Sequence, residues 1–201
     1  SLYPPERHYK EATLKRFNLD DRKLTIVYVG RLDGEKRVDL LIDAMKQLNR
    51  HDVQLVIVRK GINMEPLRRQ ASDLGSTCIF TGYVTDDEKR ALLWRADVFT
   101  MASPAELQCI AALEALLCET PVVVADQIAL PELLDNGKNG LSFRYPNVYD
   151  LAKKIEILLS NQELRDKMGR HARQWVIAYH SHNYTISQYR AVYRRLIYDR
   201  E

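Results

Sequence analysis

The sequence predicts an α/β fold, a doubly wound parallel sheet with helices on both faces. Short apolar runs rich in β-branched residues recur along the chain, and such runs are typical of strands buried on both faces. Segments with apolar residues at helical spacing separate these runs. Strands that alternate with helices at short spacing favour a parallel sheet, and such a sheet binds ligands outside the carboxyl ends of its strands.

The strands follow from the apolar runs, taken in chain order. We predict strands at residues 24–29, 53–58, 78–81, 98–102 and 121–124, and a short sixth strand at 141–143.

The helices follow from apolar spacing and from signals at their ends. After a short helix at residues 8–17, a second helix is marked by Val38, Leu41, Ile42, Met45 and Leu48. A third runs from Met64 and ends at Gly75, and Asp86 or Asp87 caps a fourth that runs to Ala96. Further helices are predicted at residues 110–118, 148–159, 162–177 and 184–199.

Length and composition restrict the class of protein. The 201 residues, 46% hydrophobic and 28% charged, suit one domain with a buried core. A net charge of +3 is too mild to indicate a nucleic-acid partner. No run of 18 apolar residues is present, so we expect no membrane-spanning helix.

The first residues and the cysteines suggest where the protein resides. Residues 1–5 contain neither a start methionine nor a signal peptide, so we interpret the chain as part of a longer cytoplasmic protein. Cys78, Cys109 and Cys118 are scattered thiols without the spacing of a metal site, as expected of small buried residues in a reducing compartment.

The segment after the first strand has the features of an anion site. Gly30 allows close backbone approach, and Arg31 and Lys36 place two cations at the carboxyl end of a strand beside a helix N-terminus. A solvated loop with two surface charges explains the same residues equally well. Neither GxGxxG nor GxxxxGK[ST] is present, so the segment is neither a dinucleotide fingerprint nor a Walker A loop.

Two carboxylates follow the fourth strand. If residues 106–114 are mostly helical, Glu106 and Glu114 lie about 12 Å apart, roughly the length of a nucleotide sugar from hexose to ribose. Backbone amides near Gln108, Cys109 and Ile110 can then meet a diphosphate between them. Glu114 lies in an apolar helix and therefore needs a partner, either a ligand or an Arg or Lys of the protein.

These segments together resemble the C-terminal domain of the large family of retaining glycosyltransferases with two Rossmann-like domains, the GT-B architecture. Residues 29–36 resemble the family's Gly-Arg-…-Glu-Lys segment, and Glu106 to Glu114 matches its Glu-x7-Glu motif. Residues 120–123, 130–132 and 136–141 resemble its Thr-Pro-Val-Val, Leu-Pro-Glu and Asn-Gly signatures. The order and spacing fit across roughly residues 20–180.

The resemblance implies transfer of a hexose from a nucleotide diphosphate to an acceptor with retention of configuration. Arg31 and Lys36 are expected to bind the diphosphate, Glu106 the hexose hydroxyls and Glu114 the ribose. The base site is expected to be lined by Gly82, Tyr83 and Val84. Charge stabilisation by cations and helix amides requires no metal and no cofactor, in keeping with the lack of an Asp-x-Asp motif.

Three segments depart from the family pattern. Leu107-Gln108-Cys109 stands where the family has Gly-Phe-Gly, which leaves the hexose open. Glu119 replaces a glycine before the Thr-Pro-Val-Val strand, and the second strand ends in Arg59-Lys60-Gly61 where the family has Gly. Arg59 and Lys60 are either additional donor contacts or exposed charges.

The resemblance also divides the chain. Residues 1–20 form a lead-in from a missing N-terminal acceptor domain, residues 21–180 bind the donor, and residues 181–201 form a helix that crosses back. That helix is basic and aromatic, with Tyr189, Arg190, Tyr193, Arg194, Arg195 and Tyr198, so a membrane surface is another partner to consider.

Three classes of function remain open at this stage. The first is a glycosyltransferase at the inner face of a membrane with a lipid or glycan acceptor, of which this chain alone is expected to be inactive. The second is one half of a nucleotide-sugar epimerase or of a phosphorylase. The third is a Rossmann-like interaction domain without catalysis, in which the charges above are ordinary surface residues.

Overall fold

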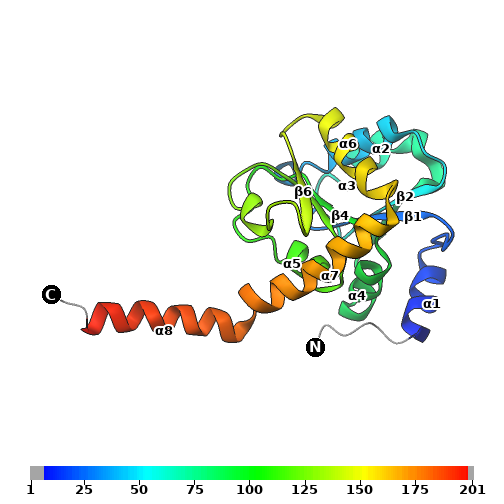
Figure 1. The fold of residues 1–201 in the computed structure, drawn as a ribbon. Coiled ribbons are helices and arrows are strands. Elements are labelled where there is room, and N and C mark those ends of the chain that lie inside the picture. The colour runs from blue at the N-terminus through cyan, green and yellow to red at the C-terminus, as the bar shows by residue number, and fades with distance from the viewer. Residues whose placement is uncertain (1–6, 199–201) are drawn as a thin grey trace.

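The computed structural model describes residues 7–198 and confirms the predicted fold class. Six parallel strands form one sheet in the order β3-β2-β1-β4-β5-β6 (Figure 1). The strands are β1 (Leu24–Val29), β2 (Val53–Val58), β3 (Cys78–Gly82), β4 (Val98–Met101), β5 (Val122–Ala125) and β6 (Gly140–Phe143). Residues 1–6 of the predicted lead-in and residues 199–201 lie outside the described part.

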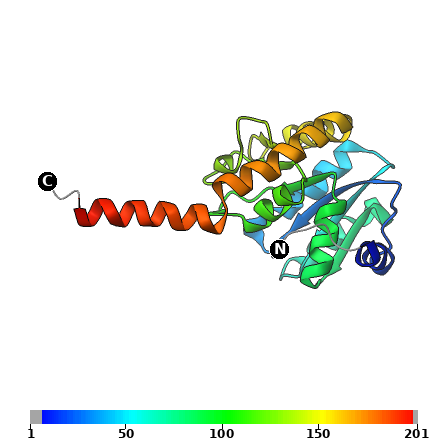
Figure 2. The same ribbon diagram turned by 60° about the horizontal axis from the view of Figure 1, so that its bottom comes forward.

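The helices cover both faces of this sheet, as predicted. They are α1 (Arg7–Arg16), α2 (Val38–Leu48), α3 (Met64–Gln70), α4 (Asp86–Arg95), α5 (Ile110–Leu117), α6 (Val148–Leu159), α7 (Gln162–Tyr179) and α8 (His182–Tyr198). Helices α2, α3 and α6 pack on one face, and α1, α4, α5 and α7 pack on the other (Figures 1 and 2). The four central strands are almost wholly buried between these layers, whereas the edge strands β3 and β6 are partly buried. Tyr28, Phe99 and Phe143 are among the largest enclosed side chains.

The strand order creates a switch point that positions the site. From β1 the chain moves to β2 and β3 on one side, and it then returns to place β4 on the other side of β1. The loops after β1 and β4 therefore leave the same sheet edge in opposite directions. In open α/β sheets this divergence forms the crevice in which ligands bind.

The start of α4 differs from the prediction. Thr85, not Asp86 or Asp87, is the N-cap, and its side chain forms a reciprocal capping box with Glu88. Burial favours a raised pKa for Glu88, but hydrogen bonds from the Thr85 amide and from Arg16 outweigh it and lower the pKa below its ordinary value of 4.5. The Arg16 contact ties α1 to α4.

One helix end was wrong, and two 3-10 turns were not predicted. The helix predicted to end at Gly75 is interrupted: α3 ends at Gln70, and the 3-10 segment η2 (Ser72–Thr77) follows, with Gly75 at a positive φ of 52°. The loop after β1 contains a 3-10 turn, η1 (Gly34–Lys36), that the periodicity did not indicate. Another, η3 (Pro131–Leu133), precedes β6.

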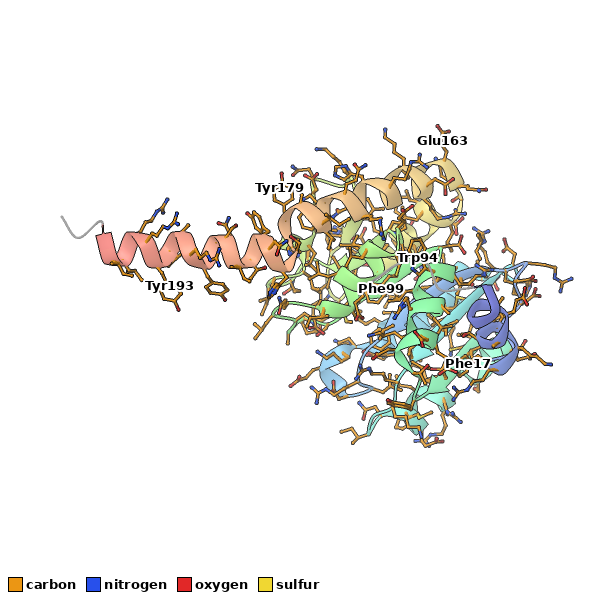
Figure 3. The ribbon with its side chains drawn as sticks, turned by 90° about the horizontal axis from the view of Figure 1, so that it is seen from below. Phe17, Trp94, Phe99, Glu163, Tyr179 and Tyr193 are labelled. Atoms are coloured by element: carbon orange, nitrogen blue, oxygen red, sulfur yellow. The ribbon has the colours of Figure 1, made fainter. Side chains whose placement is uncertain are left out.

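The last helix, α8, projects away from the body of the domain (Figures 1 and 2). Its exposed apolar side chains repeat at helical spacing and form one stripe: Tyr189, Val192, Tyr193, Leu196 and Ile197. Figure 3 shows Tyr193 on this free stretch, far from the core residue Phe99. Within residues 7–198, no helix combines the length and the apolar character needed to cross a bilayer.

Candidate functional site

The side chain of Tyr28 stabilises the loop after β1. The Tyr28 hydroxyl donates a hydrogen bond of 2.9 Å to the carbonyl of Arg31. A Cβ atom at Gly30 would lie 2.4 Å from that hydroxyl oxygen, so the loop requires glycine there. Burial, reinforced by the carboxylates of Asp33 and Glu106, raises the pKa of Tyr28, which keeps the hydroxyl protonated as a donor.

The two loops of the switch point meet in an ion pair. The Lys36 ammonium lies 2.7 Å from a carboxylate oxygen of Glu106, and only 14% and 15% of these side chains are exposed. The Ser103 hydroxyl also donates to the Glu35 carbonyl at 2.9 Å, which fixes the β4 loop against η1. Lys36, predicted to bind the diphosphate, and Glu106, predicted to bind the hexose, therefore lie in direct contact.

Arg31 lies beside this pair but faces solvent. Its side chain is 70% exposed, and its guanidinium lies 3.3 Å from Asp33. The other Asp33 carboxylate oxygen is buried and has no hydrogen-bond partner among the described residues. An exposed cation above a fixed loop is free to turn toward an incoming anion.

The Glu-x7-Glu segment is only half helical, which corrects the distance between Glu106 and Glu114 expected from a continuous helix. Helix α5 begins at Ile110, so Glu106 lies in a loop and the estimate of about 12 Å from a continuous helix does not apply. Gln108 and Ile110 are exposed, while Cys109 is buried at the N-cap, where burial raises the pKa of its thiol to about 12. Helix α5 therefore starts between two exposed residues and directly after an unreactive cysteine.

Glu114 has a protein partner, one of the two possibilities left open by the sequence. The Lys89 ammonium of α4 lies 2.7 Å from a Glu114 carboxylate oxygen. The side chains are 16% and 22% exposed, respectively. The sequence analysis did not single out Lys89.

The segment predicted for the base follows β3. Gly82 is buried with φ of 70°, and its carbonyl accepts a hydrogen bond of 2.9 Å from the Arg59 amide. Tyr83 is 75% exposed, whereas Val84 is buried. Tyr83 is thus available to a ligand, while Val84 mainly packs on the core.

The three departures from the family pattern share one backbone property. Arg59, Cys109 and Glu119 have φ of 98°, 44° and 62°, in the positive region that glycine adopts without strain. The fold has kept a glycine-like conformation at each of these positions although each carries a side chain. Arg59 and Lys60 are both exposed.

Exposed apolar side chains line the same edge of the sheet. Each lies in a loop after a strand or at the start of α5: Ile62, Tyr83, Leu107, Ile110 and Ile128. Exposed apolar side chains beside the charged loops of one sheet edge are typical of a surface that a ligand or a second protein covers. Within residues 7–198, no three His, Cys, Asp or Glu residues converge in a way that could hold a metal ion.

The doubly wound, all-parallel sheet is the Rossmann-like fold found in the domains of GT-B glycosyltransferases. The model of the family "Glycosyl transferases group 1" matches residues 10–175, and the chain belongs to that family.

Individual relatives agree with this assignment. The chain is 31% identical over 186 residues to a GDP-mannose-dependent alpha-(1-6)-phosphatidylinositol monomannoside mannosyltransferase of Mycolicibacterium smegmatis, covering 87% of this chain and 48% of the relative. It is 29% identical over 175 residues to the sulfoquinovosyl transferase SQD2 of Arabidopsis thaliana, covering 86% and 34%. This chain thus spans a third to a half of these relatives.

A solved structure shares the fold. A mutant of the S. aureus protein TarM, in complex with fondaparinux, alpha-GlcNAc-glycerol and UDP, superposes with a TM-score of 0.78 at 24% identity. The match covers 84% of this chain and 35% of TarM.

Proposed function

We propose that this chain binds the nucleotide-diphosphate sugar in a glycosyltransferase that transfers a hexose with retention of configuration. The observation that carries the proposal is the meeting of Lys36 and Glu106 at the switch point of the sheet, 2.7 Å apart. A phosphate needs the cation and a sugar hydroxyl needs the carboxylate, so one pair serves the junction between the hexose and the diphosphate.

The diphosphate takes the cationic part of the crevice. Arg31 is 70% exposed, Lys36 is held by Glu106, and α5 begins four residues after Glu106. Negative charge grows on the diphosphate as the glycosidic bond breaks through an oxocarbenium-like state. Fixed cations and amides stabilise that charge most in the transition state, which is the catalytic contribution proposed for Arg31 and Lys36.

The two carboxylates are proposed to contact the two sugar rings of the donor. Glu106, in the β4 loop, is the proposed hexose contact, and Glu114, one helical turn inside α5, is the proposed ribose contact. Carboxylates accept the hydrogen bonds that vicinal hydroxyls donate. Tyr83, exposed after β3, is the proposed surface against which the base lies. The scheme uses neither a metal nor a cofactor.

The acceptor side is proposed to come from the remainder of the parent protein. The exposed apolar rim of the crevice and the projecting stripe of α8 are surfaces that such a domain would cover. We assign α8 the role of crossing back to it. The names of relatives that act on phosphatidylinositol mannosides support a lipid acceptor, for which we propose the inner face of a membrane.

Calorimetric titration of the chain with UDP, GDP and ADP tests the proposal. We expect saturable binding of one diphosphate, weakened at least about tenfold by Arg31→Ala and by Glu114→Ala, since each removes a charged contact. A Lys153→Ala variant, changed in the exposed part of α6 away from this sheet edge, serves as the control. Absence of binding to all three diphosphates, in this chain and in the parent protein, would favour an interaction domain.

Turnover assays separate the two enzymatic alternatives. The chain alone is expected to bind donor without turnover, and the parent protein is expected to need an acceptor. Donor conversion by the parent protein without acceptor would indicate an epimerase, and dependence on inorganic phosphate would indicate a phosphorylase.

A further inference from the structure

Lys89 occupies an unfavourable place for a cation. It lies four residues after the N-cap Thr85, in the first turns of α4, where the helix dipole favours negative charge. Three acidic residues of the same turn precede it in sequence: Asp86, Asp87 and Glu88. A lysine in that position ordinarily extends into water beside its acidic neighbours.

The Lys89 side chain turns inward instead. Its ammonium lies 2.7 Å from Glu114 but 3.5 Å from Asp86, which is 93% exposed. The ammonium therefore makes its short contact with the half-buried carboxylate of another helix. Withdrawing a lysine from water in this way costs desolvation free energy, which the contact with Glu114 offsets.

The pair leaves half of the carboxylate available. Oε1 of Glu114 accepts the Lys89 hydrogen bond, and Oε2 has no hydrogen-bond partner among the described residues. A carboxylate has about four lone-pair sites, so it can keep Lys89 and still accept hydrogen bonds from two hydroxyls. The ion pair thus fixes the orientation of the carboxylate without blocking it.

The Lys89–Glu114 pair resembles the Lys36–Glu106 pair at the other end of the Glu-x7-Glu motif. Glu106 and Glu114 are each bound by a lysine at 2.7 Å through Oε1, and each lysine comes from a segment that follows a different strand. Lys36 follows β1, and Lys89 follows β3.

We infer that Lys89 is a positioning residue of the donor site, which orients Glu114 for the ribose. The inference rests on the proposed function. It assigns to the Lys89–Glu114 pair the preference for a ribonucleotide over its 2′-deoxy analogue. Both hydroxyls of a ribose engage an oriented carboxylate, and the deoxy sugar lacks one of them.

A ligand comparison tests this role. The probes are UDP, GDP or ADP, whichever the wild-type chain binds, and the corresponding 2′-deoxy diphosphate, each titrated by calorimetry. The wild type is expected to prefer the ribonucleotide by on the order of tenfold, since one charge-assisted hydrogen bond is lost. Lys89→Met, which keeps the aliphatic stem, is expected to lose most of that preference and to bind the deoxy ligand unchanged.

Matched variants separate positioning from folding. Lys89→Arg is expected to keep the preference, and so is Arg90→Met, because Arg90 pairs with the more exposed Asp87. Lys89→Gln repeats the test if Lys89→Met unfolds, as judged by circular dichroism.

The remaining outcomes overturn the inference in distinguishable ways. Equal weakening of both ligands by Lys89→Met would mean a direct phosphate contact. An unchanged preference in Lys89→Met that is lost in Glu114→Gln would mean that Glu114 acts without Lys89. If neither this chain nor the parent protein binds either ligand, the proposed function itself is refuted.

Discussion

The Lys36–Glu106 pair allows a quantitative test of the site's construction. At 2.7 Å the gross attraction of two charges is about 6 kcal/mol at an effective dielectric constant of about 20. Desolvation of two side chains that are only 14% and 15% exposed offsets most of it. We expect a net coupling of about 2 kcal/mol, the range of hydrogen bonds between charged groups.

The perturbation is a double-mutant cycle of Lys36→Met and Glu106→Gln. Each single change is expected to lower the free energy of unfolding by about 2–3 kcal/mol, because it leaves the partner half-buried and unpaired. The double change is expected to cost about 2–4 kcal/mol, which is the sum of the single changes less the coupling. Urea denaturation followed by circular dichroism gives the three differences, and low exposure predicts little dependence on salt.

The exposed pair Lys46–Asp73 is the matched control. Its atoms lie 3.2 Å apart, but the side chains are 34% and 79% exposed, so a coupling below about 1 kcal/mol is expected. If the cycle at Lys36 and Glu106 is additive within about 0.5 kcal/mol, the two loops are not joined in solution and the reasoning is refuted.

Three other changes test the scaffold by urea denaturation. Glu88→Gln is expected to lower the free energy of unfolding by about 1 kcal/mol at about pH 7. Because folding lowers the pKa of Glu88, the difference between wild type and variant should vanish as the pH falls through that lowered pKa. A difference that stays constant from about pH 7 to about pH 2 would contradict the assignment. Gly61→Ala places a methyl group 2.3 Å from the Leu32 carbonyl oxygen and is expected to lower the free energy of unfolding by about 1–3 kcal/mol. An unchanged urea midpoint would show that the loop shifts to accommodate the methyl group. Glu119→Gly removes left-handed strain at φ of 62° on an exposed side chain and is expected to stabilise by up to about 1 kcal/mol, and a clear loss of stability would argue against that strain.

The sheet was predictable because burial on both faces leaves a local signal. The bounds of β1 and β2, 24–29 and 53–58, were predicted from apolar β-branched runs alone and are confirmed. The order of the strands has no such local signal, since it depends on which runs pair. The family resemblance supplied that architecture.

The parts of the site that were missed depend on contacts between distant segments. Lys36 and Glu106 are 70 residues apart, so their pairing follows only from the adjacency of β1 and β4. Lys89 did leave a signal, a cation in the first turns of a helix beside three acidic residues. The helix predicted at residues 110–118 is confirmed as α5, but the separation of Glu106 and Glu114 could not be predicted because the left-handed turn at Cys109 has no characteristic residue type.

Mapping a bound diphosphate on the chain by amide NMR tests the central claim most directly. Titration with the diphosphate that binds should shift the amide signals of Gly30, Gly82, Cys109 and Ile110, which lie at the carboxyl edge of the sheet. The account predicts that the largest shifts cluster there and disappear in Lys36→Met. Shifts that cluster instead around α7 or along α8, with these four amides unmoved, would contradict the assignment of the donor site.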